Sequence, residues 1–253
     1  MIIHDVADIQ VGEETYVARR YDIEKKPGAT AFQSQPSWRE KRHIAIDFRD
    51  KEGRTRYWSI AKNPQLFRYE VSTSHNEKFL LRPLESVDEQ KIIHLIDNLS
   101  EKTKLFYSYH SHINPSSVIA KEMCEAINKY DKLRFVLENE NNDEIIGLFE
   151  FSLDIPSGDL ERFQNYSVRL SSKTDCRIAP LLRDDYQSQG LATIVLPIIV
   201  NIASKFNRKR IILWGGVRQD NPQAIRFYEK NGFEKLGSFV NENQTPCYDM
   251  VLK

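Results

Sequence analysis

The sequence predicts an α+β fold in which helices flank a mixed, mostly antiparallel sheet, with an additional β-rich unit at the N-terminus. Three observations carry this prediction. Short segments alternate apolar and polar residues, as half-buried strands do. Longer segments between them repeat apolar residues at helical spacing. The C-terminal end holds two strand patterns separated by a polar turn, which favours an antiparallel hairpin.

Residues 1–77 form the predicted N-terminal unit. Residues 43–49 (HIAIDFR) alternate apolar and small or polar side chains, and residues 54–61 suit a strand that returns after a turn. Residues 13–23 are a candidate for another strand, and residues 71–77 (VSTSHNE) predict a polar linker. The role of this unit is open: it could shape an acceptor site, mediate a homodimer or bind a regulator.

Residues 78–253 form the predicted second domain, with the element order β-α-α-β-β-β-α-β-α-β-β. The predicted strands are residues 78–84, 133–139, 144–153, 175–182, 209–215, 233–240 and 245–252. The predicted helices begin at Ser86, Pro115, Gly190 and Asn221; Glu89, three residues after Ser86, has the spacing of a capping box. Residues 154–173 are polar and predict a long loop with room for a helical turn.

The composition excludes several classes of function. Lysines and arginines number 36 and so do aspartates and glutamates, so the formal net charge of zero gives no general attraction to nucleic acid or to an anionic membrane. The longest apolar stretch, Leu191 to Val200, is far shorter than the roughly 20 residues of a membrane span. Three scattered cysteines and no secretory signal favour a cytoplasmic protein with reduced thiols. His110 and His112 lack partners at metal-ligand spacing, so no metal is expected.

One segment has the pattern of an anion site. Residues 187–192 (QSQGLA) follow a predicted strand and open a predicted helix. The first N–H groups of a helix have no partner in the helix and carry partial positive charge, so they bind phosphates without any net charge on the protein. Gly190 removes a side chain where a ligand would approach. Taken alone, the same pattern also suits a plain joint between a strand and a helix.

Here the sequence resembles the GNAT family of N-acetyltransferases. Residues 187–192 match the family's acetyl-CoA signature, R/Q-x-x-G-x-G/A, at every defined position. About thirty residues later the family has an Asn that opens a helix, an aromatic pair and a Gly-Phe, and this chain has Asn221, Phe227-Tyr228 and Gly232-Phe233 in register. The resemblance covers roughly residues 78–253 and leaves residues 1–77 outside it.

The resemblance implies an acetyl-CoA-dependent N-acetyltransferase that moves an acetyl group to a primary amine by direct attack in a ternary complex. Acetyl-CoA is then a cosubstrate, and the acceptor is a small molecule or a peptide. The residues implied to bind acetyl-CoA are Pro180, Leu181, Leu182, Gln187, Ser188, Gln189, Gly190, Leu191, Ala192, Thr193, Asn221 and Tyr228. A strand N–H near Leu181 or Leu182 would stabilise the developing oxyanion, and Pro180 has no N–H to do so.

Tyr228 and Glu150 are the candidate catalytic residues. Tyr228 lies seven residues after Asn221, as the family motif requires, and its phenol could protonate the leaving thiolate. It could also be an ordinary half-buried aromatic. Many relatives carry a Glu five residues before the Asn, where this chain has Gly216. Glu150, on an otherwise apolar strand, is the substitute, with a solvent-facing edge residue as the alternative reading. Asp154 and Asp175 rank lower, and a water chain could serve if the amine arrives already neutral.

Two further readings stay open at this stage. The missing carboxylate and the extra N-terminal unit also suit a CoA-binding sensor or scaffold with weak catalysis. Asp184 and Asp185, just before the signature, suit a turn better than a contact to a cationic substrate. The identity of the acceptor, the length of the acyl chain and the oligomeric state are not encoded in any motif.

Overall fold

The structure is a computed structural model of the 253-residue chain. It describes residues 67–73, 76–107, 115–126, 133–152, 155–171, 174–205 and 208–253, and the backbone of three strands near the N-terminus. These three strands, β1 (Ile2–Val11), β2 (Glu14–Ile23) and β3 (His43–Arg49), form an antiparallel sheet in that order. The strands predicted within residues 13–23 and 43–49 are confirmed, and β1 was not predicted. Residues 54–61 lie outside the described part.

The main body is a nine-stranded sheet with the order β10-β12-β9-β8-β7-β6-β5-β4, in which β11 also pairs with β12. Only the pair β8 and β9 is parallel among the described strands, so the mixed, mostly antiparallel sheet is confirmed. The strands are β4 (Tyr69–Ser72), β5 (Lys78–Pro83), β6 (Leu133–Asn139), β7 (Glu144–Ser152), β8 (Asp175–Leu182), β9 (Arg210–Leu213), β10 (Val217–Arg218), β11 (Glu234–Val240) and β12 (Pro246–Leu252).

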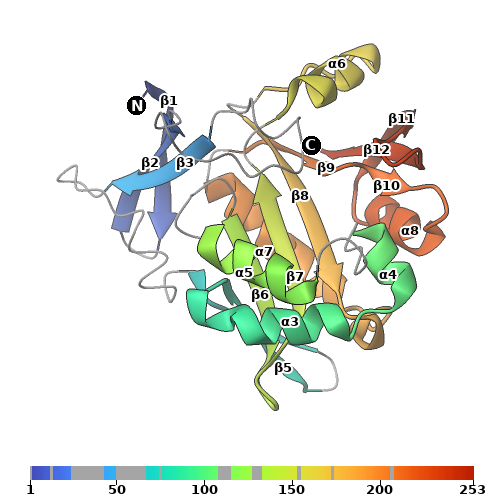
Figure 1. The fold of residues 1–253 in the computed structure, drawn as a ribbon. Coiled ribbons are helices and arrows are strands. Elements are labelled where there is room, and N and C mark those ends of the chain that lie inside the picture. Colours follow the sequence, from blue (N-terminus) through green and yellow to red (C-terminus); the bar gives the residue numbers. More distant parts are fainter. Residues whose placement is uncertain are drawn as a thin grey trace.

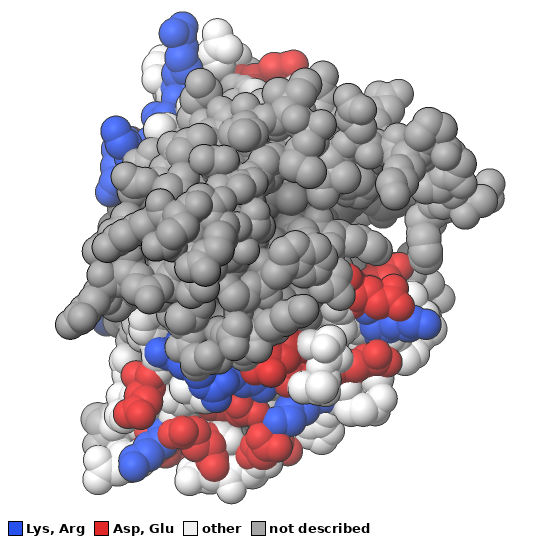
Figure 2. Space-filling view, turned by 90° about the vertical axis from the view of Figure 1, so that its left-hand side faces the viewer, with Lys and Arg blue, Asp and Glu red and all other residues white. Residues whose placement is uncertain are grey.

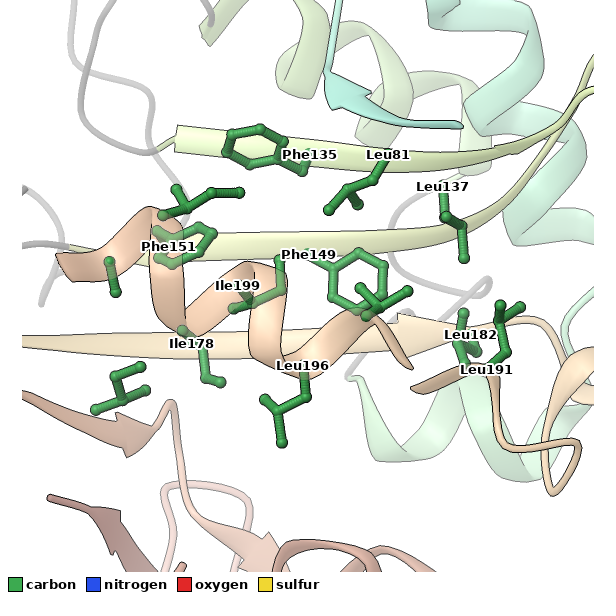
Figure 3. Packing of buried hydrophobic residues seen from close by; sticks show 14 of the residues in the cluster. Leu81, Phe135, Leu137, Phe149, Phe151, Ile178, Leu182, Leu191, Leu196 and Ile199 are labelled. Carbon is green, nitrogen blue, oxygen red and sulfur yellow. The ribbon is translucent and has the colours of Figure 1, made fainter. Parts of the chain in front are cut away.

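Helices cover both faces of this sheet (Figure 1). They are α3 (Glu89–Asp97), α4 (Glu101–Phe106), α5 (Ser116–Ala126), α6 (Ser157–Asn165), α7 (Leu191–Lys205) and α8 (Pro222–Lys230). Apolar residues of α3 and α5 pack on one face, against residues such as Leu148 and Leu181. Apolar residues of α7 pack on the other, against Phe135, Phe149 and Ile178 (Figure 3). Helix α7, which follows the signature residues, therefore packs on the sheet through its apolar side, and its first turn lies at the end of β8.

Strand β4 corrects one prediction. Residues 71–77 were expected to be a polar linker, but β4 pairs antiparallel with β5, with Tyr69 opposite Leu81 and Val71 opposite Phe79. Phe67 and Val71 are almost fully buried in the core, and their burial outweighs the polar composition around them. The large sheet therefore begins before residue 78. The division of the chain into two domains at residue 77 stays a prediction.

Two helices were not predicted as such. Residues 157–165, expected in a long loop with at most a helical turn, form the nine-residue helix α6, whose Phe163 is fully buried. Helix α4 was missed altogether. It begins after Ser100, whose side chain accepts a hydrogen bond from the Thr103 N–H (3.2 Å) and so caps the helix. The capping box at the start of the first helix lies one residue earlier than expected, since Asp88 accepts the N–H of Glu85 (2.8 Å).

Charges on the described surface are mixed. On the face in Figure 2, basic and acidic side chains alternate among the described residues, and no continuous patch of one sign is visible there. Among the described residues, no helix is long and apolar enough to cross a bilayer.

Candidate active site

Strands β8 and β9 diverge part-way along their length. Their parallel pairing runs from Asp175 opposite Arg210 to Ile178 opposite Leu213, and the Trp214 N–H extends it to the Ile178 carbonyl (2.9 Å). Strand β8 continues to Leu182, paired on its other side with β7 throughout. Residues 179–182 therefore have a strand partner on one side only. We call their other side the open edge of β8.

Backbone alternation decides which groups lie on the open edge. Neighbouring residues of a strand point their N–H and C=O groups to opposite sides. The Arg183 N–H bonds to Ile146 at the start of β7 (2.8 Å), so residues 181 and 183 face β7. Residues 178, 180 and 182 then face the open edge. Since Pro180 has no N–H, Leu182 supplies the single backbone donor of residues 179–182 on that side. Of the two expected oxyanion donors, Leu182 has its N–H on the open edge and Leu181 faces β7.

The signature residues form a tight loop between β8 and α7. Ser188 (φ 61°) and Gly190 (φ 81°) both adopt left-handed backbone conformations, which only glycine adopts without strain. The Gly190 carbonyl accepts the N–H groups of Thr193 (2.9 Å) and Ile194 (3.2 Å), so the helix starts there. Ser188, Gln189, Gly190 and Thr193 are exposed. The N–H groups of Leu191 and Ala192, in the first turn, are donors of the kind that bind a diphosphate.

Three glutamine side chains fix this loop. Gln187 donates to the Leu182 carbonyl (2.9 Å) and Gln189 donates to the Asp185 carbonyl (2.5 Å). Gln223, in the first turn of α8, donates to the Ser188 hydroxyl (3.0 Å). The two signature glutamines therefore hold the loop through backbone carbonyls, and Gln187 connects it to the open edge of β8. Gln223 connects the loop to α8.

Asn221 caps helix α8. Its side-chain oxygen accepts the N–H of Ala224 (3.1 Å), and Pro222 occupies the first helical position, where no N–H is needed. This cap fixes the residue at which α8 begins. Whether it also contacts acetyl-CoA stays a prediction.

Tyr228 lies on the buried side of α8. Its ring makes edge contacts with Phe227 (5.2 Å between centroids) and Phe233 (5.1 Å), and the residue is 8% exposed. Burial, and then the neighbouring Tyr107 phenol, raise its pKa well above the ordinary value. At neutral pH Tyr228 therefore carries its proton and can donate it.

Tyr107 is the residue that sequence reasoning missed. It ends α4, and its hydroxyl donates a hydrogen bond to the Pro180 carbonyl on the open edge of β8. Burial, followed by the charge of Asp184, raises its pKa, so it too is protonated at neutral pH. The start pattern Ser100–Glu101 was a signal for α4. No signal in the sequence joins position 107 to position 180.

The candidate bases are engaged in ion pairs. The carboxylate of Glu150 lies 2.6 Å from Arg134 Nε, and both side chains are largely buried; Glu150 also stands opposite Ala179 on β8. The predicted alternative of a solvent-facing edge residue is wrong, because β7 is an inner strand. Asp175 is fully buried and bound by Arg210 (2.7 and 2.8 Å). Asp154 and the His110–His112 pair lie outside the described residues.

Gly216 explains the absence of the family's usual carboxylate. It has φ 68°, and a Cβ at this position would lie 2.6 Å from the Tyr248 carbonyl and 2.7 Å from the Phe239 ring. The backbone therefore excludes a glutamate at this position, as it excludes any other side chain.

Asp184 and Asp185 have structural roles. Asp184 accepts three hydrogen bonds from the start of α4: from Ser100 N–H (2.8 Å), Ser100 Oγ (2.6 Å) and Thr103 Oγ1 (2.7 Å). Asp185 pairs with Arg183 (2.8 and 2.9 Å). The turn before the signature loop is thus joined to α4, the helix that carries Tyr107.

The three cysteines, Cys124, Cys176 and Cys247, are free and buried. No group of three or more His, Cys, Asp or Glu side chains in the described part of the chain could hold a metal ion. Burial raises the pKa of the Cys176 thiol to about 12, so this cysteine is not a nucleophile at neutral pH.

Comparisons with known proteins agree with this geometry. The sequence model described as the acetyltransferase (GNAT) family matches residues 99–233, more than half of the chain. No curated protein sequence gives a significant match.

Solved structures give the same fold at low identity. The GNAT domain of S. lividans PAT is similar with a TM-score of 0.55 and 16% identity, over 75% of this chain and 98% of that one. The aminoglycoside acetyltransferase AAC(6′)-Ib, in complex with coenzyme A and kanamycin, has a TM-score of 0.53 and 19% identity, over 69% and 94%. Spermidine N-acetyltransferase from Vibrio cholerae, in complex with CoA and spermine, has a TM-score of 0.51 and 20% identity, over 69% and 94%.

Proposed function

Because the chain belongs to the GNAT acetyltransferase family, we propose that it transfers the acetyl group of acetyl-CoA to a primary amine by direct attack in a ternary complex. One observation carries the proposal: hydrogen bonds connect the open edge of β8, the signature loop before Gly190 and helix α8, which carries Tyr228. The open edge would bind the pantetheine arm of acetyl-CoA, the helix start would bind its diphosphate, and Tyr228 would donate a proton.

The residues present fit acetyl-CoA. The N–H groups at the start of α7, with residues 187–193, would hold the diphosphate, since a helix start attracts anions without a net positive charge. The open edge of β8 at residues 180–182 would hold the pantetheine arm, whose amides can pair with backbone groups as a further strand would. Asn221 and Tyr228 complete the set. When bound, acetyl-CoA supplies an acetyl group activated as a thioester.

Two groups of the chain would then act on the reacting atoms. The Leu182 N–H points to the open edge and would donate to the carbonyl oxygen as negative charge develops on it during attack. Tyr228 would give its proton to the departing sulfur. Its raised pKa keeps the phenol in the donor form, although it also makes the proton harder to lose.

The base is assigned to Glu150 as a proposal. Its carboxylate shares a face of the sheet with Leu148 and is held by Arg134, so it would act on the amine through a water molecule. If the amine arrives already neutral, a water chain could accept the proton that its nitrogen loses after attack. Cys176 is buried and protonated, which supports direct attack over a route through an acetyl-cysteine.

We further propose that the acceptor is an amine-bearing small molecule or peptide. Structures of similar fold include complexes with kanamycin and with spermine, both rich in amines, which supports an amine acceptor without choosing among them. A cytoplasmic location, the absence of nucleic-acid and membrane partners, and a homodimer through residues 1–77 remain predictions.

The test is an assay of CoA release from acetyl-CoA over a panel of aminoglycosides, polyamines, amino acids and peptide N-termini. Turnover with one class supports the proposal and names the acceptor. Binding of acetyl-CoA without turnover on any amine contradicts it.

That second outcome favours the alternative of a CoA-binding sensor or scaffold. The observations that support this alternative are the closed backbone at Gly216 and the ion pair that engages Glu150. Calorimetry separates the two functions, because a sensor of this kind would bind CoA and acetyl-CoA equally well and would hold a protein partner through residues 1–77.

A further inference from the structure

The carbonyl groups on the open edge of β8 already have donors from the chain itself. Ile178 accepts from the Trp214 N–H, and Leu182 accepts from the Gln187 side chain, each at 2.9 Å. Pro180 accepts from the Tyr107 hydroxyl. The first bond continues the pairing of β8 with β9, and the second belongs to the signature loop. The third comes from a separate element, 73 residues earlier in the chain.

At residue 180 a ligand along this edge can pair only with a backbone acceptor. Because proline has no N–H, residue 180 offers the open edge only its carbonyl. An extended ligand with an amide would place its N–H opposite that carbonyl, as a strand does. The Tyr107 hydroxyl reaches the carbonyl from the same side, so its side chain lies in the space beside the strand that the ligand would use.

We propose that the Tyr107 hydroxyl occupies the place of a pantetheine amide in the free protein, and that the pantetheine arm displaces it from the Pro180 carbonyl on binding. The proposal deepens the proposed function and rests on it. Tyr107 is then a residue of the acetyl-CoA site that opposes binding, because its hydrogen bond must be broken before the arm can pair with the strand.

The surroundings of Tyr107 indicate how it would move. Asp184 holds the start of α4 through Ser100 and Thr103, and the Tyr107 N–H is bonded to the Thr103 carbonyl (3.2 Å). The backbone at residue 107 is therefore fixed, and displacement is a rotation of its side chain rather than a departure of the helix. The raised pKa of this phenol keeps it a hydrogen-bond donor throughout the neutral range.

Calorimetric titration of the full chain with CoA tests the proposal, using wild type, Tyr107→Phe and the control Tyr166→Phe. Tyr166 also donates its hydroxyl to a backbone carbonyl, but to that of Ser238 on β11 (3.5 Å) and not to one on the open edge of β8. We expect Tyr107→Phe to bind CoA about 2- to 12-fold more tightly, the net worth of one competing hydrogen bond, and Tyr166→Phe to bind it unchanged. All three proteins should bind 3′-phospho-ADP, which has the diphosphate but no pantetheine arm, with equal affinity.

The outcomes separate this inference from the proposed function. A wild-type chain that binds no CoA refutes the proposed function and the inference with it. A wild-type chain that binds CoA, with Tyr107→Phe binding it no more tightly, refutes the inference alone. An equal gain for 3′-phospho-ADP also refutes it, because the gain would not come from the arm. If Tyr107→Phe does not fold, Tyr107→Leu, which lacks the hydroxyl and part of the ring, is expected to shift CoA affinity in the same direction.

Discussion

Replacing Asp184 by asparagine tests the link between the turn before the signature loop and α4. The carboxylate accepts three hydrogen bonds at 2.6–2.8 Å, from Ser100 and Thr103. An asparagine oxygen has two lone pairs, so at least one of the three bonds is lost and the others lose their charge. A hydrogen bond to a charged group contributes about 1.5–3 kcal/mol. Since Asp184 is half-exposed, we expect Asp184→Asn to lower the free energy of unfolding by about 1–3 kcal/mol.

The assay is urea unfolding at several pH values, with Asp185→Asn as the matched control. Asp185 is more exposed (59% of its side chain) and pairs only with Arg183, so its loss should cost less than about 1 kcal/mol. Burial raises the pKa of Asp184, but the hydrogen bonds from Ser100 and Thr103 outweigh burial, so its pKa is lowered in the folded protein. Its stabilisation is therefore complete above the unfolded pKa of about 3.9 and is lost as the pH falls through the folded value. Equal costs for the two variants, or an Asp184→Asn cost that does not shrink in acid, would refute the reasoning.

Three further substitutions examine the site itself. Tyr228→Phe is expected to lower kcat about 100-fold while the Kd of CoA stays nearly constant; an unchanged kcat in steady-state assays would remove the phenol from the mechanism. Glu150→Gln should lower kcat/KM about 100-fold, whereas Arg134→Gln, which breaks the same ion pair but keeps the carboxylate, should retain most activity; equal losses would assign Glu150 a structural role. Gly216→Ala should lower the free energy of unfolding in urea by about 2–5 kcal/mol, because it adds a steric clash to a left-handed backbone. The control Gly215→Ala, where the space is open, should lower it by about 1–2 kcal/mol. Similar losses for the two variants would contradict the exclusion of a side chain at residue 216.

The elements that hold the acetyl-CoA signature were predictable because their determinants are local. The apolar run of β8, the glycine at the start of α7 and the asparagine that caps α8 all act within a few residues of themselves. The closing hairpin is local in the same way.

The features that sequence reasoning missed depend on contacts between distant segments. Helix α4 has only six residues, too few for an apolar period to be recognised, and it is secured by Asp184, more than eighty residues later. The hydrogen bond from Tyr107 to Pro180 has no local signature at all. Gly216 could be recognised as a departure from the family, but its cause, the nearby Tyr248 carbonyl, appears only in the folded chain.

The parallel pairing of β8 with β9 has a mechanical consequence for the whole molecule. Four register pairs, from Asp175–Arg210 to Ile178–Leu213, connect the part of the sheet made by β4–β8 to the part made by β9–β12. At one end of this pairing the buried Asp175 carboxylate forms an ion pair with Arg210, and at the other end the strands separate. Weakening the pairing of Asp175 with Arg210 should therefore accelerate amide exchange along these four register pairs before it does so in the middle of β6 or β7.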